Sequence, residues 1–487
     1  MLDNIIPDKK ILFVHPLGYN SENAESDISR KANIMPPLGL ASIAAYLEQF
    51  QIKTHIIDCY AQPDSESLLV AYLKKERPQY IGFSCTTATF LDGIRIAEKV
   101  VRKILPEIDI IFGGVHVSAL REKLLTTFPV IDYIVIGEGE YTLYQLLMTD
   151  KNNFEKIKNI AFRKENGEVI FTGFGKKMIA LDTLPFPSYE KLPGYPENYK
   201  LPIFNYPKVP NASCISSRGC PYSCSYCDRS VFKKSFRYNS AQYLYNHLKY
   251  LKNKFNIRHI NFYDDQFTFN RSRVEEFARL MIEDPLKMTF NCAARAEHLD
   301  FDLLKLMKEA GCWMISLGIE TGDENLLAQH RQNPDLEMMR DKIYLIKKAG
   351  IRVKGLLMMG LPGESEESIK KSKAYVFSLP IDDFNLAKFT PFPGSPIYKT
   401  IKEQGDKLGS FNEKWEKMDC MQFLFIPRDL TLEKMETLFI DFYKSHFKRP
   451  HVLMGYVSML WKSPDSWIRF IKDIALFVNF AFTNKRV

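Results

Sequence analysis

The chain has 487 residues, of which 46% are hydrophobic and 25% are charged, the composition of a folded protein with several domains. This composition excludes a disordered, collagen-like or low-complexity protein. The net charge is +8, and the segment from Lys444 to Val487 alone holds eight basic and two acidic residues. The rest of the chain is therefore close to neutral, and we expect no nucleic-acid partner.

The amino-terminal sequence has neither the apolar core nor the cleavage site of a signal peptide. No run reaches the roughly 18 uncharged apolar residues that a membrane-spanning helix needs. We therefore expect a cytoplasmic protein. Nine cysteines, three of them clustered, favour metal or redox chemistry over disulfides in that compartment.

Residues 10–148 alternate five short, apolar, β-rich runs with amphipathic helical runs. Apolar strands joined by helices predict a parallel sheet covered on both faces, so we place a doubly wound α/β domain at residues 1–150. Ligands of such sheets bind beyond the carboxyl ends of the strands. The residues at these ends are His15 to Gly18, Ser84 to Thr87, Gly113 and Gly114, and Gly137 to Glu140.

Residues 151–210 have a different pattern. A β-hairpin is predicted with its turn at Glu165-Asn166-Gly167, and a proline-rich linker follows it. Over residues 211–400, six further strands alternate with helices, which predicts a partial (β/α)6 barrel with its chemistry at the strand carboxyl ends. Residues 401–487 are expected to be helical and to end in a basic tail.

Three cysteines stand close together in GCPYSCSYC, directly after the first barrel strand: Cys220, Cys224 and Cys227. Three thiolates on a short loop can hold three irons of a [4Fe–4S] cube and leave the fourth iron open to a ligand. The alternative is structural zinc, which takes four ligands in two pairs. No second pair is present, since Cys214 and His247 fall on a strand and a helix.

This cysteine motif, with Tyr226 before its third cysteine, resembles the signature of radical S-adenosylmethionine (radical SAM) enzymes. The segments YDDQFT, SLGIETG, GLLMMGLPGE and FTPFPGSPIY are similar to later motifs of that barrel. MPPLGLASIAAYLEQF, FGGVHVSALREKL and DYIVIGEGE resemble the cobalamin-binding domain that precedes the barrel in one class. That class includes anaerobic tetrapyrrole cyclases and hopanoid and antibiotic methylases.

The resemblance implies that SAM chelates the open iron and is cleaved to a 5′-deoxyadenosyl radical, which takes hydrogen from an unactivated carbon. It assigns SAM contacts to seven residues of the barrel: Tyr226, Asp264, Asp265, Arg295, Glu320, Gly360 and Gly363. From the residues alone, either aspartate could instead cap a helix or turn, and Arg295 could form a surface salt bridge.

The resemblance also assigns cobalamin contacts to seven residues of the first domain: Ser84, Thr86, Thr87, Gly113, Gly114, Gly137 and Glu138. The alternative for the glycines is a tight βα turn. Many cobalamin proteins bind the metal through the His of Asp-x-His-x-x-Gly, but here Phe13 stands at the Asp position before His15. Without a carboxylate to orient it, we expect His15 not to be the axial ligand.

With cobalamin bound, the resemblance implies methylation of a lipid, isoprenoid or other small molecule, with flavodoxin or ferredoxin as reductant. The first alternative is an oxidative cyclase or other carbon–carbon bond-forming enzyme, and the second is a non-catalytic cobalamin sensor. A methylthiotransferase should carry more cysteines in its first domain than Cys59 and Cys85 and should end in a β-barrel.

The carboxyl-terminal tail has a helical period from Ser463 onward, with Trp467, Phe470, Ile471 and Ile474 on one face and Arg469, Lys472, Asp473 and Asn479 on much of the other. The face continues through Phe477, Val478 and Ala481. A basic, aromatic amphipathic helix favours an anionic membrane surface, so residues 452–487 are a candidate peripheral contact. The alternative is a helix packed on the barrel.

Overall fold

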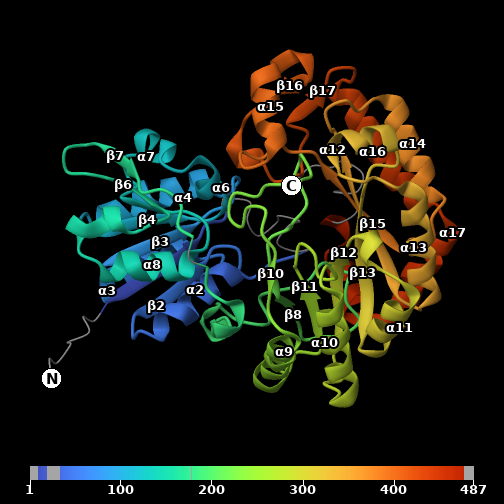
Figure 1. Cartoon of the computed structure of the whole chain (residues 1–487), viewed down its shortest axis with the longest axis horizontal. Helices are drawn as coiled ribbons and strands as arrows, with labels where there is room; N and C mark the ends of the chain where they lie inside the picture. The colour runs from blue at the N-terminus through green and yellow to red at the C-terminus, as the bar shows by residue number, and fades with distance from the viewer. Residues whose placement is uncertain (1–8, 19–32, 177, 477–487) are drawn as a thin grey trace.

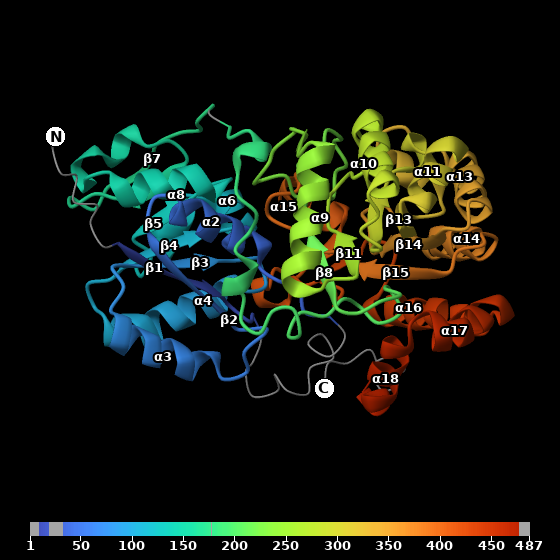
Figure 2. The ribbon, with the colours of Figure 1, turned by 90° about the horizontal axis from the view of Figure 1, so that it is seen from below.

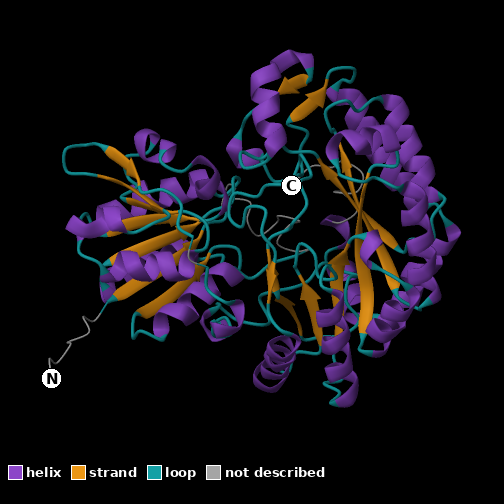
Figure 3. Ribbon diagram, viewed as in Figure 1, coloured by secondary structure: helices purple, strands orange, loops and turns teal. Residues whose placement is uncertain are grey.

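The computed structural model describes residues 9–18, 33–176 and 178–476. Figure 1 shows two α/β units side by side, with a smaller group of strands and helices above the second unit. The secondary-structure colouring of Figure 3 shows that the strands of both units converge, through loops, on the space between them. The mixed α/β class predicted from the sequence is confirmed.

The first unit is a seven-stranded sheet in the order β2-β1-β3-β4-β5-β6-β7. The five predicted strands pair in parallel: β1 (Lys10–His15), β2 (Lys53–Asp58), β3 (Tyr80–Ser84), β4 (Asp109–Gly113) and β5 (Tyr133–Val135). Helices α2 (Leu38–Glu48) and α8 (Gly139–Met148) cover one face, whereas α3 (Ser65–Glu76) and α4 (Phe90–Ile96) cover the other (Figure 2). Short helices α5 (Arg102–Ile104), α6 (Val115–Leu120) and α7 (Lys123–Thr127) complete the crossovers.

The predicted hairpin is present as β6 (Ile160–Arg163) and β7 (Val169–Phe171). Its turn needs Gly167, whose φ is +87°. Strand β6 pairs antiparallel with β5, so the hairpin extends the first sheet at its edge instead of standing apart from it.

The second unit is a six-stranded parallel sheet in the order β15-β14-β13-β12-β11-β8, an open half-barrel. The strands are β8 (Asn211–Cys214), β11 (His259–Phe262), β12 (Thr289–Ala294), β13 (Cys312–Glu320), β14 (Arg352–Met359) and β15 (Asp383–Lys388). A short antiparallel pair, β9 (Ser217–Arg218) and β10 (Arg237–Tyr238), follows β8.

Helices line the outside of the half-barrel: α9 (Ala241–Phe255), α10 (Arg271–Glu283), α11 (Phe301–Glu309), α12 (Glu324–His330), α13 (Leu336–Lys348) and α14 (Glu366–Phe377). Each of these helices begins after a Ser, Asn or Asp whose side chain accepts a hydrogen bond from a first-turn N–H. These capping residues are Ser240, Asn270, Asp300, Asp323, Asp335 and Ser365.

The expectation that residues 401–487 are helical is only partly correct. Helices α15 (Pro396–Gln404) and α16 (Leu432–Phe447) are present, but an antiparallel pair, β16 (Gly409–Phe411) and β17 (Phe425–Pro427), lies between them. Three-residue strands are too short to produce a period of two in the sequence. The loop between them carries Trp415 to the first unit, where its ring centroid lies 4.6 Å from that of His116.

The tail is helical as α17 (Pro450–Lys462) and α18 (Pro464–Lys472). Phe477, Val478, Asn479 and Ala481 lie outside the described residues. Helix α18 packs on the linker: Ser466 Oγ accepts the N–H of Phe204 at 3.0 Å, and Arg469 donates to Leu201 O at 2.8 Å. The linker in turn closes the amino end of the half-barrel, where Lys354 donates to Asn205 Oδ1 at 2.9 Å.

Candidate functional site

The three cysteines lie on the loop after β9 and line a cavity of about 410 Å³, the cluster cavity. Four residues that the resemblance assigned to SAM also line it: Tyr226, Asp265, Arg295 and Glu320. Asp265, Arg295 and Glu320 come from the carboxyl ends of β11, β12 and β13, because parallel strands end at one edge of the sheet.

Neighbouring loops hold the cysteine loop in place. Ser225 donates its N–H to His330 O and its hydroxyl contacts His330 Nδ1, both at 2.9 Å. Asp228 accepts the N–H of Gly394 at 3.2 Å. A Cβ on Gly394 would lie 2.2 Å from Asp228 Oδ1, so any larger residue at this position in FTPFPGSPIY would displace the Asp228 carboxylate.

The cysteines have unequal acidities. Hydrogen bonding with Cys227 and the nearby Arg295 and Arg331 guanidinium groups lower the pKa of Cys224 to about 6, against the effect of burial. The same hydrogen bond and burial raise the pKa of Cys227, and burial raises that of Cys220. The lowered pKa of Cys224 favours its thiolate, the form that binds metal.

Glu320 ends β13 in a strained conformation. Its φ is +64°, and the pairing of β13 with β14 shifts register between Gly318 and Glu320. Burial raises the pKa of its carboxyl to about 7, although Arg331 and the Tyr226 hydroxyl oppose this shift. A non-glycine residue with positive φ in a cavity wall is typical of a functional position.

Two arginines face the cysteines. The Arg295 guanidinium lies 3.7 Å from the ring centroid of Tyr222 and pairs with Glu297 at 2.5 Å. Arg331, which was not predicted from the sequence, donates to Gly318 O at 2.5 Å and lies 3.7 Å from Glu297. It follows α12 instead of a strand, so no pattern in the sequence indicated it.

Three residues assigned to SAM do not line the cluster cavity. Asp264 is buried, and its Oδ1 accepts hydrogen bonds from Ser216 N–H, the Ser216 hydroxyl and the Ser217 hydroxyl. The Ser216 N–H also reaches Oδ2 at 3.1 Å. Gly360 and Gly363 have φ of +103° and +86°, and a Cβ on them would approach Met435 and Gln329. Backbone conformation and packing account for both glycines.

A second cavity of about 290 Å³, the interdomain cavity, lies between the carboxyl edge of the first sheet and the half-barrel. Five of the residues assigned to cobalamin line it: Ser84, Gly113, Gly114, Gly137 and Glu138. Thr86 and Thr87 do not: the Thr86 N–H donates to Thr89 Oγ1 at 2.9 Å, and Thr87 Oγ1 contacts His116 Nδ1 at 3.2 Å.

The two glycines after β4 have different roles. Gly114 has φ of +98°, and a Cβ there would lie 2.5 Å from Cys85 O, which is the tight turn that the fold itself requires. A Cβ on Gly113 would have no neighbour closer than Val135 O at 3.6 Å. Gly113 therefore leaves room in the cavity wall, as close approach of a ligand to the backbone requires.

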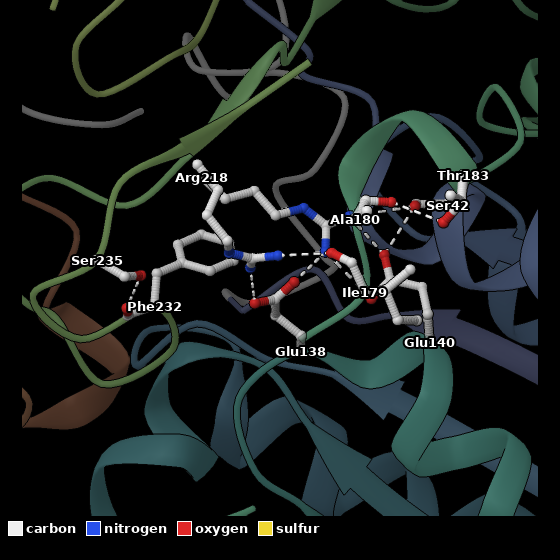
Figure 4. A network of polar contacts seen from close by, with 10 residues as sticks. Ser42, Glu138, Glu140, Ile179, Ala180, Thr183, Arg218, Phe232 and Ser235 are labelled. Carbon is white, nitrogen blue, oxygen red and sulfur yellow. Dashed lines mark hydrogen bonds and ion pairs between the residues drawn. The ribbon is translucent and has the colours of Figure 1, made fainter. Parts of the chain in front are cut away.

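Glu138 takes part in an ion-pair network between the two units (Figure 4). Arg218 of β9 pairs with Glu138 and with Glu140, at 2.6 Å to Glu140 Oε1, and Arg237 also pairs with Glu138. Ser42 Oγ donates to Glu140 Oε1 at 2.8 Å. Arg218 immediately precedes Gly219 and Cys220, so the network ties the first unit to the strand that leads into the cysteine loop.

The expectation that His15 has no carboxylate partner is wrong. Asp58 Oδ1 lies 2.9 Å from His15 Nδ1, and the parallel register of β1 and β2 places these residues side by side. The carboxylate comes from the neighbouring strand instead of from position 13. His15 is not among the residues that line the interdomain cavity.

The two cavities meet. Asp265, Val231 and Phe232 line both of them. A molecule in this shared space would touch the wall of the cysteine cavity and the carboxyl edge of the first sheet at once.

Comparison with known proteins agrees with this arrangement. Residues 28–147 match the model of the B12 binding domain, and residues 214–376 match that of the radical SAM superfamily. An uncharacterized methyltransferase from Pyrococcus horikoshii is 29% identical over 91% of this chain and 94% of its own length. The anaerobic magnesium-protoporphyrin IX monomethyl ester cyclase of Cereibacter sphaeroides is 26% identical over 81% of this chain and 64% of its own length.

The fold also matches a solved structure, that of the cobalamin-dependent SAM radical enzyme OxsB with aqua-cobalamin and S-adenosylmethionine bound. The TM-score is 0.70 at 16% identity, and the match covers 99% of this chain and 74% of OxsB. The half-barrel with its cysteine loop and the preceding sheet correspond to the two matched models. The chain therefore belongs to the radical SAM enzymes that carry a B12-binding domain before the radical SAM domain.

Proposed function

We propose that this protein is a cobalamin-dependent radical SAM enzyme that methylates an unactivated carbon of a small-molecule or lipid substrate in the cytoplasm. The observation that carries the proposal is the shared space at Asp265, Val231 and Phe232, where the cluster cavity and the interdomain cavity meet. A substrate in that space is accessible from both sites.

The donor set of the cysteine loop fits a [4Fe–4S] cluster. Three thiols are available, and hydrogen bonding with Cys227 lowers the pKa of Cys224. Among the described residues no three His, Cys, Asp or Glu side chains converge on a single metal position. A cube does not need such convergence, because each of its irons takes one cysteine.

We assign SAM to the polar wall of the cluster cavity. Arg295 and Arg331 supply positive charge for its carboxylate, and Asp265 and Glu320 supply acceptors for its ammonium and hydroxyl groups. We assign cobalamin to the interdomain cavity, where Ser84, Gly113 and Gly137 form a wall with little side-chain bulk. When bound, the cluster and SAM supply a radical that abstracts hydrogen, and cobalamin supplies the methyl group.

The identifying experiment is anaerobic reconstitution with iron, sulfide and cobalamin, followed by reduction by flavodoxin or ferredoxin in the presence of SAM. We expect about four irons per chain, release of 5′-deoxyadenosine, and a 14-mass-unit gain in a metabolite or lipid extract from a deletion strain. Cys220→Ala, Cys224→Ala and Cys227→Ala should each lose the cluster absorbance. Retention of iron in these variants, or zinc in the wild type, would overturn the proposal.

The cyclase relative makes ring formation the second candidate. A product with a new ring and no added methyl group would establish it. A protein that binds cobalamin but releases no 5′-deoxyadenosine would instead be a sensor.

We further propose that helices α17 and α18 contact an anionic membrane surface. Eight large apolar side chains on and just after these helices are exposed: Leu453, Met454, Val457, Leu460, Trp461, Ile468, Ile471 and Ile474. Lys462 and Lys472 are exposed on the same helices. Among the described residues, no helix combines the length and apolarity needed to cross a bilayer, so the contact would be interfacial.

The test is binding to phosphatidylcholine vesicles with and without about 25% phosphatidylglycerol, a content high enough to give an anionic surface. The triple variant Met454→Ser, Trp461→Ser, Ile468→Ser should bind the anionic vesicles at least about tenfold more weakly, because each side chain loses apolar burial. The control is Leu68→Ser with Leu432→Ser, which are exposed elsewhere. Equal partitioning of the triple variant and the wild type would reject this contact.

A further inference from the structure

A third cavity of about 620 Å³ opens beside the Arg218 network, and we call it the lysine pocket. Its lining includes Lys156 and Lys158 before β6, and Lys233 and Lys234 from the loop after the cysteines. Neither the family models nor the resemblance assigns a ligand to these residues.

The charges of three of these lysines are not balanced by carboxylates in the described part of the chain. Lys156 donates to Asn153 Oδ1 at 2.6 Å, and Lys158 donates to Thr172 O at 2.8 Å. The Lys233 ammonium lies 3.3 Å from the ring centroid of Phe174. Each of these three side chains is thus held in place by a neutral group.

The carboxylates of the pocket wall do not cancel these charges. Among the described lining residues they are Glu138 and Glu140, and both are engaged by Arg218, with Arg237 as a further partner of Glu138. Figure 4 shows both glutamates turned toward the Arg218 guanidinium. The pocket therefore presents excess positive charge around a concave surface, which suits a small anionic group better than a flat protein contact.

The lysine pocket is also connected to the other two cavities. Val231 and Phe232 line all three, and Glu138 and Glu140 line both the lysine pocket and the interdomain cavity. An elongated molecule could therefore place its charged end among the lysines and its apolar part beside Val231 and Phe232.

We propose that the lysine pocket binds a phosphate or carboxylate group of the substrate, whose apolar part passes Val231 and Phe232 into the space shared by the cofactor cavities. The identity of this ligand as the substrate rests on the proposed function, whereas its binding does not. The substrate is then an amphiphilic anion and not a neutral hydrocarbon.

The test is isothermal titration calorimetry of the cobalamin-loaded full chain. The ligands are n-hexyl phosphate, hexanoate, inorganic phosphate and neutral n-hexanol. We expect binding of hexyl phosphate or hexanoate, competition by phosphate, and no binding of hexanol. The double variant Lys158→Gln, Lys233→Gln should bind the preferred anion at least about tenfold more weakly, since two charge-assisted contacts are lost. The control is Lys75→Gln with Lys399→Gln, whose side chains are 83% and 80% exposed.

Unchanged affinity in the Lys158 and Lys233 variant would overturn the inference, as would absence of binding of both amphiphilic anions to the wild type. Slower cluster reduction by flavodoxin in the variant with unchanged anion binding would show a protein-docking face, and would also overturn it. Lysine-dependent anion binding without SAM cleavage would overturn the proposed function alone. SAM cleavage without lysine-dependent binding would overturn this inference alone.

Discussion

At the scale of single residues, Gly394 controls the position of the cysteine loop, because the space for its Cβ is filled by the Asp228 carboxylate. Gly394→Ala should lower the free energy of unfolding by about 1–3 kcal/mol, the usual range for overpacking, and should reduce iron content after reconstitution. Chemical denaturation and iron analysis measure the two effects.

The control for this substitution is Gly455→Ala in α17, where a Cβ would have no neighbour within 4 Å. It should stabilise the helix by about 0.5–1 kcal/mol and leave iron content unchanged. If both substitutions changed the free energy of unfolding and the iron content equally, the Asp228 contact would not hold the cysteine loop in position.

Glu364 gives a residue-scale prediction for pH. Burial raises the pKa of its carboxyl from the ordinary 4.5 to about 8, although it accepts the N–H of Gly360. Between these two values the folded state retains a proton that the unfolded state releases, so this group makes stability fall as pH rises. Glu364→Gln keeps the acceptor and removes the titration.

We therefore expect the stability of Glu364→Gln relative to the wild type to grow between pH 5 and pH 8, by on the order of 3 kcal/mol. Urea denaturation across this range checks the sign. A difference that is constant with pH would mean that the Glu364 carboxyl is not protonated in the folded protein.

At the scale of elements, the Arg218 network joins the start of α8 to β9. Arg218→Ala should lower the free energy of unfolding by about 3–5 kcal/mol, because it leaves the buried Glu140 carboxylate without its partner. It should also lower methyl transfer more than SAM cleavage, since the network joins the two cofactor sites. Denaturation and the ratio of methylated product to 5′-deoxyadenosine measure these effects.

The double variant Arg218→Met, Glu140→Gln should regain much of the stability, as removal of both charges avoids the unpaired group. Arg271→Ala is the matched control. It breaks ion pairs with Glu275 and Asp300 on the surface and should cost at most about 1 kcal/mol. If Arg218→Ala lowered the free energy of unfolding by no more than Arg271→Ala does, the network would not hold the two units together.

At the scale of the whole molecule, the tail and the linker close the amino end of the half-barrel together. Deletion of residues 463–487 removes Ser466 and Arg469, which bond the linker at Phe204 and Leu201. We expect a melting temperature lower by several degrees, about 2–4 °C for each kcal/mol lost, measured by calorimetry. An unchanged melting temperature would show that the helix does not support the linker. Because the deletion affects folding, point variants on the exposed face are the sharper test of membrane contact.

Much of the fold follows from the sequence because it depends on local patterns. The apolar runs of β1 to β5 and of the six barrel strands predict parallel strands, and capping residues such as Ser240 and Asp300 mark where helices begin. The pair β16 and β17 could not be predicted, since three residues give no period.

The residues of the site also fall into two groups, those that the sequence predicts and those whose position depends on the fold. Cys220, Cys224 and Cys227 are contiguous in the sequence, so their chemistry is evident from spacing alone. Asp264 and Asp265 are adjacent, yet only Asp265 lines the cavities. Their difference depends on Ser216 and Ser217, about 50 residues earlier in the chain.

The two α/β units and the cysteine loop suited to iron follow from the sequence alone, because strands, caps and the cysteine motif are local. Three features are visible only in the folded structure: Asp58 contacts His15, Arg218 joins the two units, and three cavities meet at Val231 and Phe232. These features bring together residues far apart in the chain, and their contacts depend on how the sheets pack.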